Sequence, residues 1–275
     1  MPELPEVETI VRDLRRLVTG AQVRTVVVVR DDLIDSDPAW FEQSLAGARI
    51  EQVTRRAKNI VMKIGAVAPG AERLVINLGM TGRVLVLGVD AAEPSHPGVR
   101  FQLEDGRRLL YQDVRRFGRL QLLSGEAWAS RSAALGLEPL SDEFTPEALH
   151  GLTRRSRVAI KTWLMDQRRV VGVGNIYASE ALFRAGVSPR KAAGRLLRRE
   201  TTRLHETIRA VLDEAIEFRG TTLLDYRDAA GERGGFALRL EVYDRAGKPC
   251  PACGTAIRRI VQGARSTFFC PTCQR

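Results

Sequence analysis

The second residue of the chain, Pro2, becomes a secondary amine at the chain end once Met1 is removed, and aminopeptidases remove methionine before small residues, proline included. A secondary amine condenses with an aldehyde carbon to give an iminium cation, which eases proton loss and β-elimination at the neighbouring carbons. Glu3 follows directly, and a carboxylate at this position can move the protons of such a reaction. The first residues therefore predict a nucleophile, Pro2, and a neighbouring general acid/base group, Glu3.

The same segment also fits an ordinary helix start. Pro5 suits a first helical turn, and the carboxylates of Glu6 and Glu8 complement the positive end of the helix dipole. Apolar residues then recur at three- and four-residue spacing, which predicts an amphipathic helix up to Gly20. These residues are Val7, Ile10, Val11, Leu14 and Val18. On this segment alone, both interpretations stand.

All four cysteines lie near the end of the chain, as two Cys-x-x-Cys pairs with sixteen residues between them. The pairs are Cys250 with Cys253 and Cys270 with Cys273. The spacing is typical of a tetrahedral zinc site, and four thiolates leave no open coordination position, so we expect one structural Zn²⁺ ion. A redox pair and adventitious cysteines are the alternatives. Two β-rich runs meet at Gln262–Gly263, which predicts a hairpin with Arg265 near its tip.

Three further motifs combine basic or polar residues with glycine or an aromatic ring. Residues 113–118 (DVRRFG) place Phe117 beside arginines, as in wedges that fill the space of an extruded base, with a solvated strand-end turn as the alternative. Residues 172–175 (GVGN) precede a helix, so they form either a phosphate site or a tight turn. Residues 55–58 (RRAK) are a basic strand end, which can also serve only to discourage aggregation.

Charge and hydropathy narrow the class of protein. The 275 residues carry a formal net charge of +10 and a pI of about 10.1, an excess that favours a polyanionic partner such as nucleic acid, although a merely basic soluble protein is the alternative. The apolar runs are too short for a transmembrane helix, and no secretory signal is present, so we expect a cytoplasmic protein.

The pattern of elements changes along the chain. From residue 21 to about 124 short β-rich runs alternate with turn signals, with one helix at 37–45, which predicts a β-sandwich or barrel. Residues 136–144 have the composition of a linker, and mostly helical segments follow. Residues 220–237, rich in glycine and charge, predict a mobile loop before the cysteine-bearing tail.

Taken together, these motifs make the sequence resemble the formamidopyrimidine-DNA glycosylase family of bifunctional base-excision repair enzymes over essentially the whole chain. The matching motifs, in family order, are PELPEVET at 2–9, RRAK at 55–58, LGMTG at 78–82, DVRRFG at 113–118, GVGNIYASEALF at 172–183, GTTL at 220–223 and the terminal CPAC…RSTFFCPTCQ. The resemblance implies an enzyme that removes oxidised purines (8-oxoguanine and formamidopyrimidines) and then cleaves the abasic strand by β,δ-elimination.

The resemblance also implies catalytic roles. Pro2 would attack the anomeric carbon of the deoxyribose and displace the damaged base, and Glu3 would move the protons. Glu6 would help to position the chain end. Lys58 would supply positive charge near the lesion, and Arg265 would act with these residues by gripping a phosphate.

Further residues are implied to bind DNA. Asn175 would grip a phosphate beside the flipped nucleotide, whereas Met80, Arg115 and Phe117 would form the wedge that fills the vacated stack. The complete implied set is Asn77, Met80, Arg115, Arg116, Phe117, Asn175 and Arg265. The implied partner is double-stranded DNA that contains an oxidised base or an abasic site, bound by a monomer associated with a bacterial nucleoid.

The fold implied is an α+β multidomain protein with three parts. Residues 1–135 would form a catalytic N-terminal helix and β-sandwich. Residues 136–238 would form a helix-two-turn-helix domain with a lesion-capping loop at 220–237. Residues 239–275 would form a zinc-finger β-hairpin.

Some positions depart from the family pattern. Asn77 stands where histidine is usual, and Arg219 and Leu224 stand where glycine and arginine are expected, which bears on lesion preference more than on chemistry. Two other functions stay open: an endonuclease VIII-like glycosylase for oxidised pyrimidines, which shares the fold and the N-terminal proline, and a zinc-ribbon DNA-binding protein without an active nucleophile.

Overall fold

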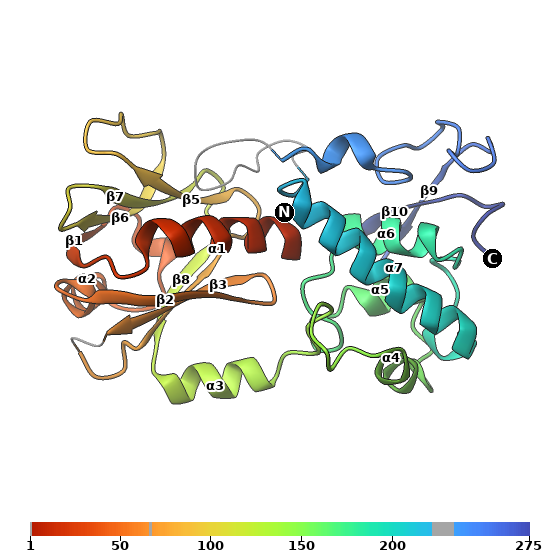
Figure 1. Cartoon of the computed structure of the whole chain (residues 1–275), viewed down its shortest axis with the longest axis horizontal. Coiled ribbons are helices and arrows are strands. Elements are labelled where there is room, and N and C mark those ends of the chain that lie inside the picture. Colours follow the sequence, from red (N-terminus) through yellow and green to blue (C-terminus); the bar gives the residue numbers. More distant parts are fainter. Residues whose placement is uncertain (1, 66–67, 222–233) are drawn as a thin grey trace. The chain divides into compact units, whose positions relative to one another are not determined.

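The computed structural model describes residues 2–65, 68–221 and 234–275, which divide into two compact units (Figure 1). The first unit comprises residues 1–134 and 218–235, and the second comprises residues 135–217 and 236–275. The three-part division expected from the sequence stays a prediction. Met1 and most of the predicted capping loop, Leu224 included, lie outside the described residues.

Two four-stranded antiparallel sheets form the core of the first unit. Their strand orders are β1-β6-β7-β5 and β2-β3-β4-β8. The strands are β1 (Val23–Val28), β2 (Arg49–Arg56), β3 (Asn59–Gly65), β4 (Arg73–Asn77), β5 (Gly82–Leu87), β6 (Pro97–Leu103), β7 (Arg108–Asp113) and β8 (Arg119–Leu123). Side chains of both sheets share one hydrophobic cluster, so the predicted β-sandwich is confirmed. Strand β2 was not predicted, because its sequence is mostly polar and only Ile50 and Val53 are buried.

The first helix of this unit, α1 (Leu4–Val18), packs on the sandwich through the five predicted apolar residues, all of them buried (Figure 1). Helix α2 (Pro38–Leu45) begins as predicted, because the Asp37 carboxylate accepts the Trp40 N–H at 2.9 Å. Helix α3 (Gly125–Ala133) and the 3₁₀ turn η1 (Asp31–Leu33) complete the unit.

The second unit is mostly helical. Its elements are α4 (Pro146–Thr153), α5 (Ile160–Leu164), α6 (Asn175–Arg184), η2 (Ala193–Arg195), α7 (Arg198–Glu217), η3 (Phe236–Arg239), β9 (Arg258–Gln262) and β10 (Arg265–Phe269). Helices α6 and α7 pack side by side (Figure 1). The segment 136–144 is packed here and is not a loose linker, since the Gly136 N–H donates to the Gln167 carbonyl and Phe144 is buried.

The hairpin β9–β10 shares a small apolar cluster with α6, which includes Phe183 of α6, Ile257, Phe268 and two of the cysteines. This shared cluster is too small to fold alone, so the tail depends on α6 and on its own metal site. Among the residues that the structure describes, no helix is both long and apolar enough to cross a bilayer.

Candidate functional site

The chain end lies at the start of α1, where two carboxylates are buried. Pro2 is buried, and Glu3 and Glu6 are each 2 % exposed. The Glu6 carboxylate accepts the Glu3 N–H at 2.8 Å through Oε2, as one half of a capping box. Its other oxygen, Oε1, accepts the Thr221 N–H at 2.7 Å. Glu6 therefore joins the chain end to the start of the predicted capping loop.

Residues 219 and 220 lead into that loop, and Arg219 is one of the departures from the family pattern. Gly220 has a φ of +84°, and a Cβ there would lie 2.9 Å from the Glu6 carboxylate, so only glycine fits. Arg219 also has a positive φ, +59°, which costs a residue with a Cβ about 1 kcal/mol and which glycine adopts freely. Its guanidinium pairs with Asp13 of α1 at 2.6 Å, a contact that a glycine lacks and that offsets part of the strain.

Lys58 lies in the two-residue turn between β2 and β3 and is half-buried. The preceding Ala57 has a φ of +54°, which closes the turn tightly. Arg55 holds this turn near α1, because its Nε donates to Glu8 at 3.0 Å and its Nη1 donates to the Ala57 carbonyl at 2.9 Å. Lys58 is thus fixed relative to the helix that begins at the chain end.

The predicted wedge residues come from two turns of the sandwich. Met80 lies in the turn between β4 and β5, and Arg115 and Phe117 lie in the turn between β7 and β8. Met80 is 36 % exposed and Phe117 is 55 % exposed, and the Arg115 guanidinium stacks on the Phe117 ring at 4.8 Å. Arg116 pairs instead with Asp32 at 3.1 Å.

Asn77 shapes the first of these turns. Its Oδ1 accepts the Gly79 N–H at 3.0 Å, and its Nδ2 donates to Asn59 at 3.1 Å. The residue that stands in place of histidine therefore contributes to the conformation of the Met80 turn. Its contact with DNA stays a prediction.

In the second unit, Asn175 is the first residue of α6 and follows a turn pinned by one side chain. Gln167 accepts the Gly172 N–H at 2.7 Å and donates to the Val173 carbonyl at 2.9 Å. The Asn175 Oδ1 accepts a hydrogen bond from Lys161, and its Nδ2 lies 3.4 Å from the Tyr243 hydroxyl. The side-chain NH₂ group of Asn175 therefore faces Tyr243, and both residues line the groove described next.

That groove has a volume of about 560 Å³ and is lined by both predicted phosphate-binding residues of this unit, Asn175 and Arg265. Arg265 is exposed at the first position of β10, directly after the turn formed by Gly263 and Ala264, whose φ angles are +53° and +58°. Such a two-residue turn is typical of tight hairpins, so the expected place of Arg265 near the tip is found. The groove gathers amide, guanidinium and hydroxyl donors, which suit phosphate oxygens.

Lys161 was not predicted as a site residue, although it supports this groove. It is fully buried on α5, and its Nζ donates to Asn175, to the Ser266 carbonyl at 2.8 Å and to the Thr267 hydroxyl at 2.9 Å. One ammonium group thus ties the start of α6 to the hairpin. A lysine inside the mostly apolar run VAIKTWL was the only signal for it in the sequence.

The four cysteines converge as the sequence predicts. Their sulfur atoms lie within 4.8 Å of one another, at 3.9 Å between Cys250 and Cys273 and at 3.5 Å between Cys253 and Cys270. A tetrahedron with metal–sulfur bonds of about 2.3 Å has edges of about 3.8 Å, so these thiols fit one zinc ion. The cysteines form a structural zinc site that closes the base of the hairpin.

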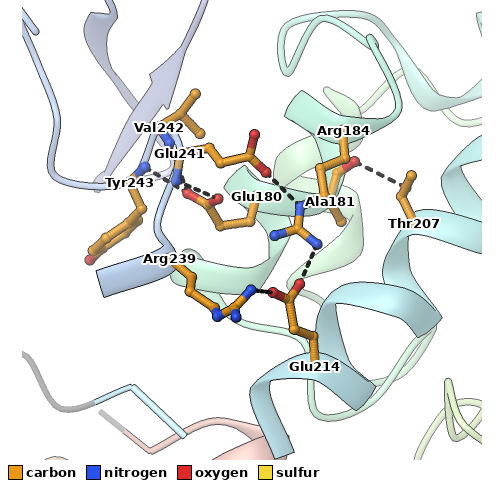
Figure 2. Close-up of polar contacts among 9 residues, drawn as sticks. All are labelled: Glu180, Ala181, Arg184, Thr207, Glu214, Arg239, Glu241, Val242 and Tyr243. Atoms are coloured by element: carbon orange, nitrogen blue, oxygen red, sulfur yellow. Dashed lines mark hydrogen bonds and ion pairs between the residues drawn. The ribbon is translucent and has the colours of Figure 1, made fainter. Parts of the chain in front are cut away.

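A buried carboxylate of the second unit was also not predicted as a site residue. Glu180 of α6 is fully buried and accepts the N–H groups of Glu241, Val242 and Tyr243 at 2.9, 3.0 and 2.8 Å (Figure 2). Burial raises the pKa of Glu180. The three hydrogen bonds act in the opposite direction, but burial has the larger effect. Glu180 fixes the segment that enters the hairpin and places Tyr243 beside Asn175.

Charged side chains surround this contact (Figure 2). Arg184 donates to Glu241 at 2.7 Å and to Glu214 of α7 at 2.6 Å, and Arg239 donates to Glu214 at 2.8 Å. Although burial opposes it, Arg184 lowers the pKa of Glu214. The ion pairs link α6, α7 and the segment before the hairpin.

Comparison with protein families matches nearly the whole chain. Residues 1–120 match the formamidopyrimidine-DNA glycosylase N-terminal domain, residues 135–226 match the H2TH domain of formamidopyrimidine-DNA glycosylase, and residues 247–275 match a zinc finger found in that protein and in isoleucyl-tRNA synthetase.

Individual proteins are similar along the full length. The chain is 44 % identical over 275 residues to a formamidopyrimidine-DNA glycosylase of Chloroflexus aggregans, covering 100 % of this chain and 98 % of that one. It is 46 % identical over 276 residues to that of Thioalkalivibrio sulfidiphilus, covering 100 % of both.

Solved structures of the Lactococcus lactis enzyme have the same fold. One, of a point mutant in complex with DNA that contains Fapy-dG, superposes with a TM-score of 0.92 at 31 % identity over 100 % of both chains. Another, of the wild-type protein with DNA that contains an oxidised pyrimidine, has a TM-score of 0.91 at 31 % identity over 100 % of both.

Proposed function

Because the chain belongs to the formamidopyrimidine-DNA glycosylase family of base-excision repair, we propose that it excises oxidised purines with Pro2 as the nucleophile and then cleaves the abasic strand by β,δ-elimination. The observation that carries the proposal is the start of α1, where Pro2 precedes two buried carboxylates. A carboxylate held in a capping box keeps a defined position relative to the chain end, as proton transfer requires.

The proposed reaction begins when the Pro2 nitrogen bonds to C1′ of the deoxyribose. The C1′–N bond to the damaged base breaks, and the base leaves with a proton. Ring opening gives an iminium between Pro2 and C1′, and proton loss from C2′ then expels the 3′ phosphate. A second proton loss, from C4′, expels the 5′ phosphate, after which water releases the sugar remnant and restores the amine. Glu3 accepts and returns these protons.

The remaining residues bind and deform the duplex, in our proposal as a monomer. The Asn175 amide and the Arg265 guanidinium hold phosphates next to the extruded nucleotide, and Lys58 adds a positive charge near the lesion. Met80, Arg115 and Phe117 enter the vacated stack. Extrusion costs on the order of a few kcal/mol, which phosphate contacts and an inserted wedge offset. Binding should weaken steeply with added salt, since counterion release supplies the phosphate contribution.

Borohydride reduction tests the nucleophile, because it traps a Schiff base covalently on abasic DNA. We expect Pro2→Gln to lose at least about 100-fold in trapping, because glutamine at this position prevents removal of Met1 and leaves no secondary amine. Mass spectrometry of each protein establishes whether Met1 is present. Pro5→Ala, in the same helical turn, keeps the amine and should trap like the wild type. Equal trapping by Pro2→Gln would place the nucleophile elsewhere.

A panel of duplexes tests the substrate class and the elimination. The proposal expects faster cleavage at 8-oxoguanine and formamidopyrimidines than at oxidised pyrimidines, with phosphates at both ends of the gap. A preference for oxidised pyrimidines would assign the protein an endonuclease VIII-like activity. A wild-type protein that binds DNA but neither cleaves nor traps would be a binding protein only.

A further inference from the structure

Two turns that are distant in sequence form one exposed apolar tip on the first unit. The Met80 turn comprises residues 78–82, and the Phe117 turn comprises residues 114–118. Met80, Val114 and Phe117 are 36 %, 54 % and 55 % exposed, although a side chain of this kind is normally buried. Exposed apolar groups gathered at one place mark a binding surface, and here they coincide with the proposed wedge.

Both turns are held by a single buried carboxylate, that of Asp113, which is 3 % exposed. Its Oδ1 accepts the Thr81 hydroxyl at 2.5 Å and the Arg115 N–H at 3.2 Å. Its Oδ2 accepts the Gly118 N–H at 2.8 Å and the Tyr111 hydroxyl at 3.3 Å. The donors on Arg115 and Gly118 bracket the Phe117 turn, whereas Thr81 belongs to the Met80 turn.

Thr81 closes the connection between the turns. Its hydroxyl donates to Asp113 and also accepts the Arg115 N–H at 3.0 Å. Each turn therefore contributes to holding the other. A buried carboxylate is costly without donors. Three donors from the two turns, together with the Tyr111 hydroxyl of β7, offset that cost only when the turns are in this arrangement.

The backbones of the two turns are also in direct contact. A Cβ on Gly79 would lie 2.5 Å from the Phe117 carbonyl carbon, and one on Gly118 would lie 2.8 Å from the carbonyl oxygen of Asn77, directly before the Met80 turn. Gly79 has a φ of +56°, a conformation that favours glycine. No side chain can enter between the turns, so they cannot shift independently without breaking the Asp113 contacts.

We propose that Asp113 is a positioning residue that sets the Met80 and Phe117 turns as one preformed wedge before DNA binds. The proposal rests on the proposed function, since it concerns how that enzyme opens the base stack. A wedge that is already ordered loses little conformational entropy on insertion, so binding energy remains available to unstack the bases. Tyr111 supports the same carboxylate from the core, and burial together with Asp113 raises the pKa of its hydroxyl.

The test follows wedge insertion directly, with 2-aminopurine next to the lesion, whose fluorescence rises when its stack is broken. Asp113→Asn replaces one carboxylate oxygen with an NH₂ group, which then faces hydrogen-bond donors of the two turns. Thr81→Val removes the hydroxyl that joins the turns. We expect both variants to slow the fluorescence rise and lesion excision in duplex DNA by about 10-fold or more. Thr81→Ser, which keeps the hydroxyl, should restore the wild-type rate to within about 2-fold.

A substrate without a stack separates positioning from general damage to the fold. On a single-stranded abasic oligonucleotide there is no stack to open, so all variants should be trapped by borohydride at the wild-type rate. Asp105→Asn is the matched control, because Asp105 also accepts a backbone N–H, that of Arg107 at 3.0 Å, but does so in the turn between β6 and β7. All assays are run well below each variant's melting temperature.

Two results would overturn the positioning role. One is a wild-type fluorescence rise in both Asp113→Asn and Thr81→Val, and the other is an equal loss on single-stranded and duplex substrates. Neither result touches the proposed function, which fails instead if the wild-type protein does not trap abasic DNA.

Discussion

Asp113 and Glu180 are both buried carboxylates that hold backbone N–H groups, but they organise different kinds of structure. Asp113 combines two N–H groups with two hydroxyls, all from turns and strands of its own sandwich. Glu180 takes three consecutive N–H groups from a segment some sixty residues further along the chain, at 241–243 (Figure 2). The first shapes an exposed apolar tip, and the second orients the entry to a zinc hairpin.

In the proposed function, the two carboxylates serve two different tasks, which are the opening of the base stack and the binding of DNA. The Asp113 turns concern the opening of the base stack, a step that follows binding. The Glu180 segment carries Tyr243, which contacts Asn175 in the groove proposed to bind phosphate, and in that proposal it concerns how tightly DNA is held. Changes to the Asp113 contacts should slow steps after binding, and changes to the Glu180 contacts should weaken affinity.

The largest effect should come from the zinc site. Cys270→Ser removes one of four thiolates, so we expect loss of zinc and at least about 100-fold weaker binding to a duplex with an abasic-site analogue. The sandwich has its own core and should stay folded by circular dichroism. Thr272→Ala, between two zinc ligands but not one of them, is the control. Unchanged zinc content and affinity in Cys270→Ser would remove the structural role of the metal.

The next effect tests whether Lys161 joins α6 to the hairpin. Lys161→Met leaves three acceptors without this donor, each at a cost of about 1–3 kcal/mol, and two of them belong to the groove-lining residues Asn175 and Ser266. Affinity should therefore fall by about 10- to 100-fold while zinc stays bound. Lys191→Met, which removes a lysine that pairs with Glu200 away from the groove, is the matched control. Anisotropy titrations measure both, and equal losses in the two variants would contradict a specific role for Lys161.

The sequence predicts contacts that are local and misses those that depend on distant segments. Each Cys-x-x-Cys pair, the capped start of α2 and the apolar face of α1 lie within short windows, so spacing alone identifies them. Lys161 and Glu180 were missed because most of their partners are distant in sequence. Two of the three Lys161 acceptors lie 105 and 106 residues away, and the Glu180 donors lie 61 to 63 residues away. Asp113 lay inside a motif that was noticed for its arginines and Phe117, and nothing local links it to Thr81, 32 residues earlier.

Glu180→Gln sharpens the comparison with Asp113→Asn. Glutamine keeps the shape but turns an N–H donor toward one of the three backbone N–H groups, at a cost of about 1–3 kcal/mol in unfolding free energy, and affinity should fall by about 10-fold. With DNA at saturation, the 2-aminopurine signal should rise at the wild-type rate, unlike that of Asp113→Asn. Glu206→Gln, exposed on α7, is the control. A slowed signal at saturation would show that the two tasks are not separate.

The smallest effect concerns pH. Because burial raises the pKa of Glu180 in the folded protein, the folded state takes up a proton at a higher pH than the unfolded chain. Lowering the pH toward that pKa therefore raises the unfolding free energy of the wild type relative to Glu180→Gln, which cannot titrate there, by at most about 1.4 kcal/mol per pH unit. Glu241 and Arg184, the charged neighbours, are present in both proteins, so the two proteins differ only at residue 180. Urea unfolding at pH 7.5 and 5.5 should show a larger gap between the two proteins at pH 5.5. A smaller gap would mean that the three N–H groups outweigh burial and hold the carboxylate ionised.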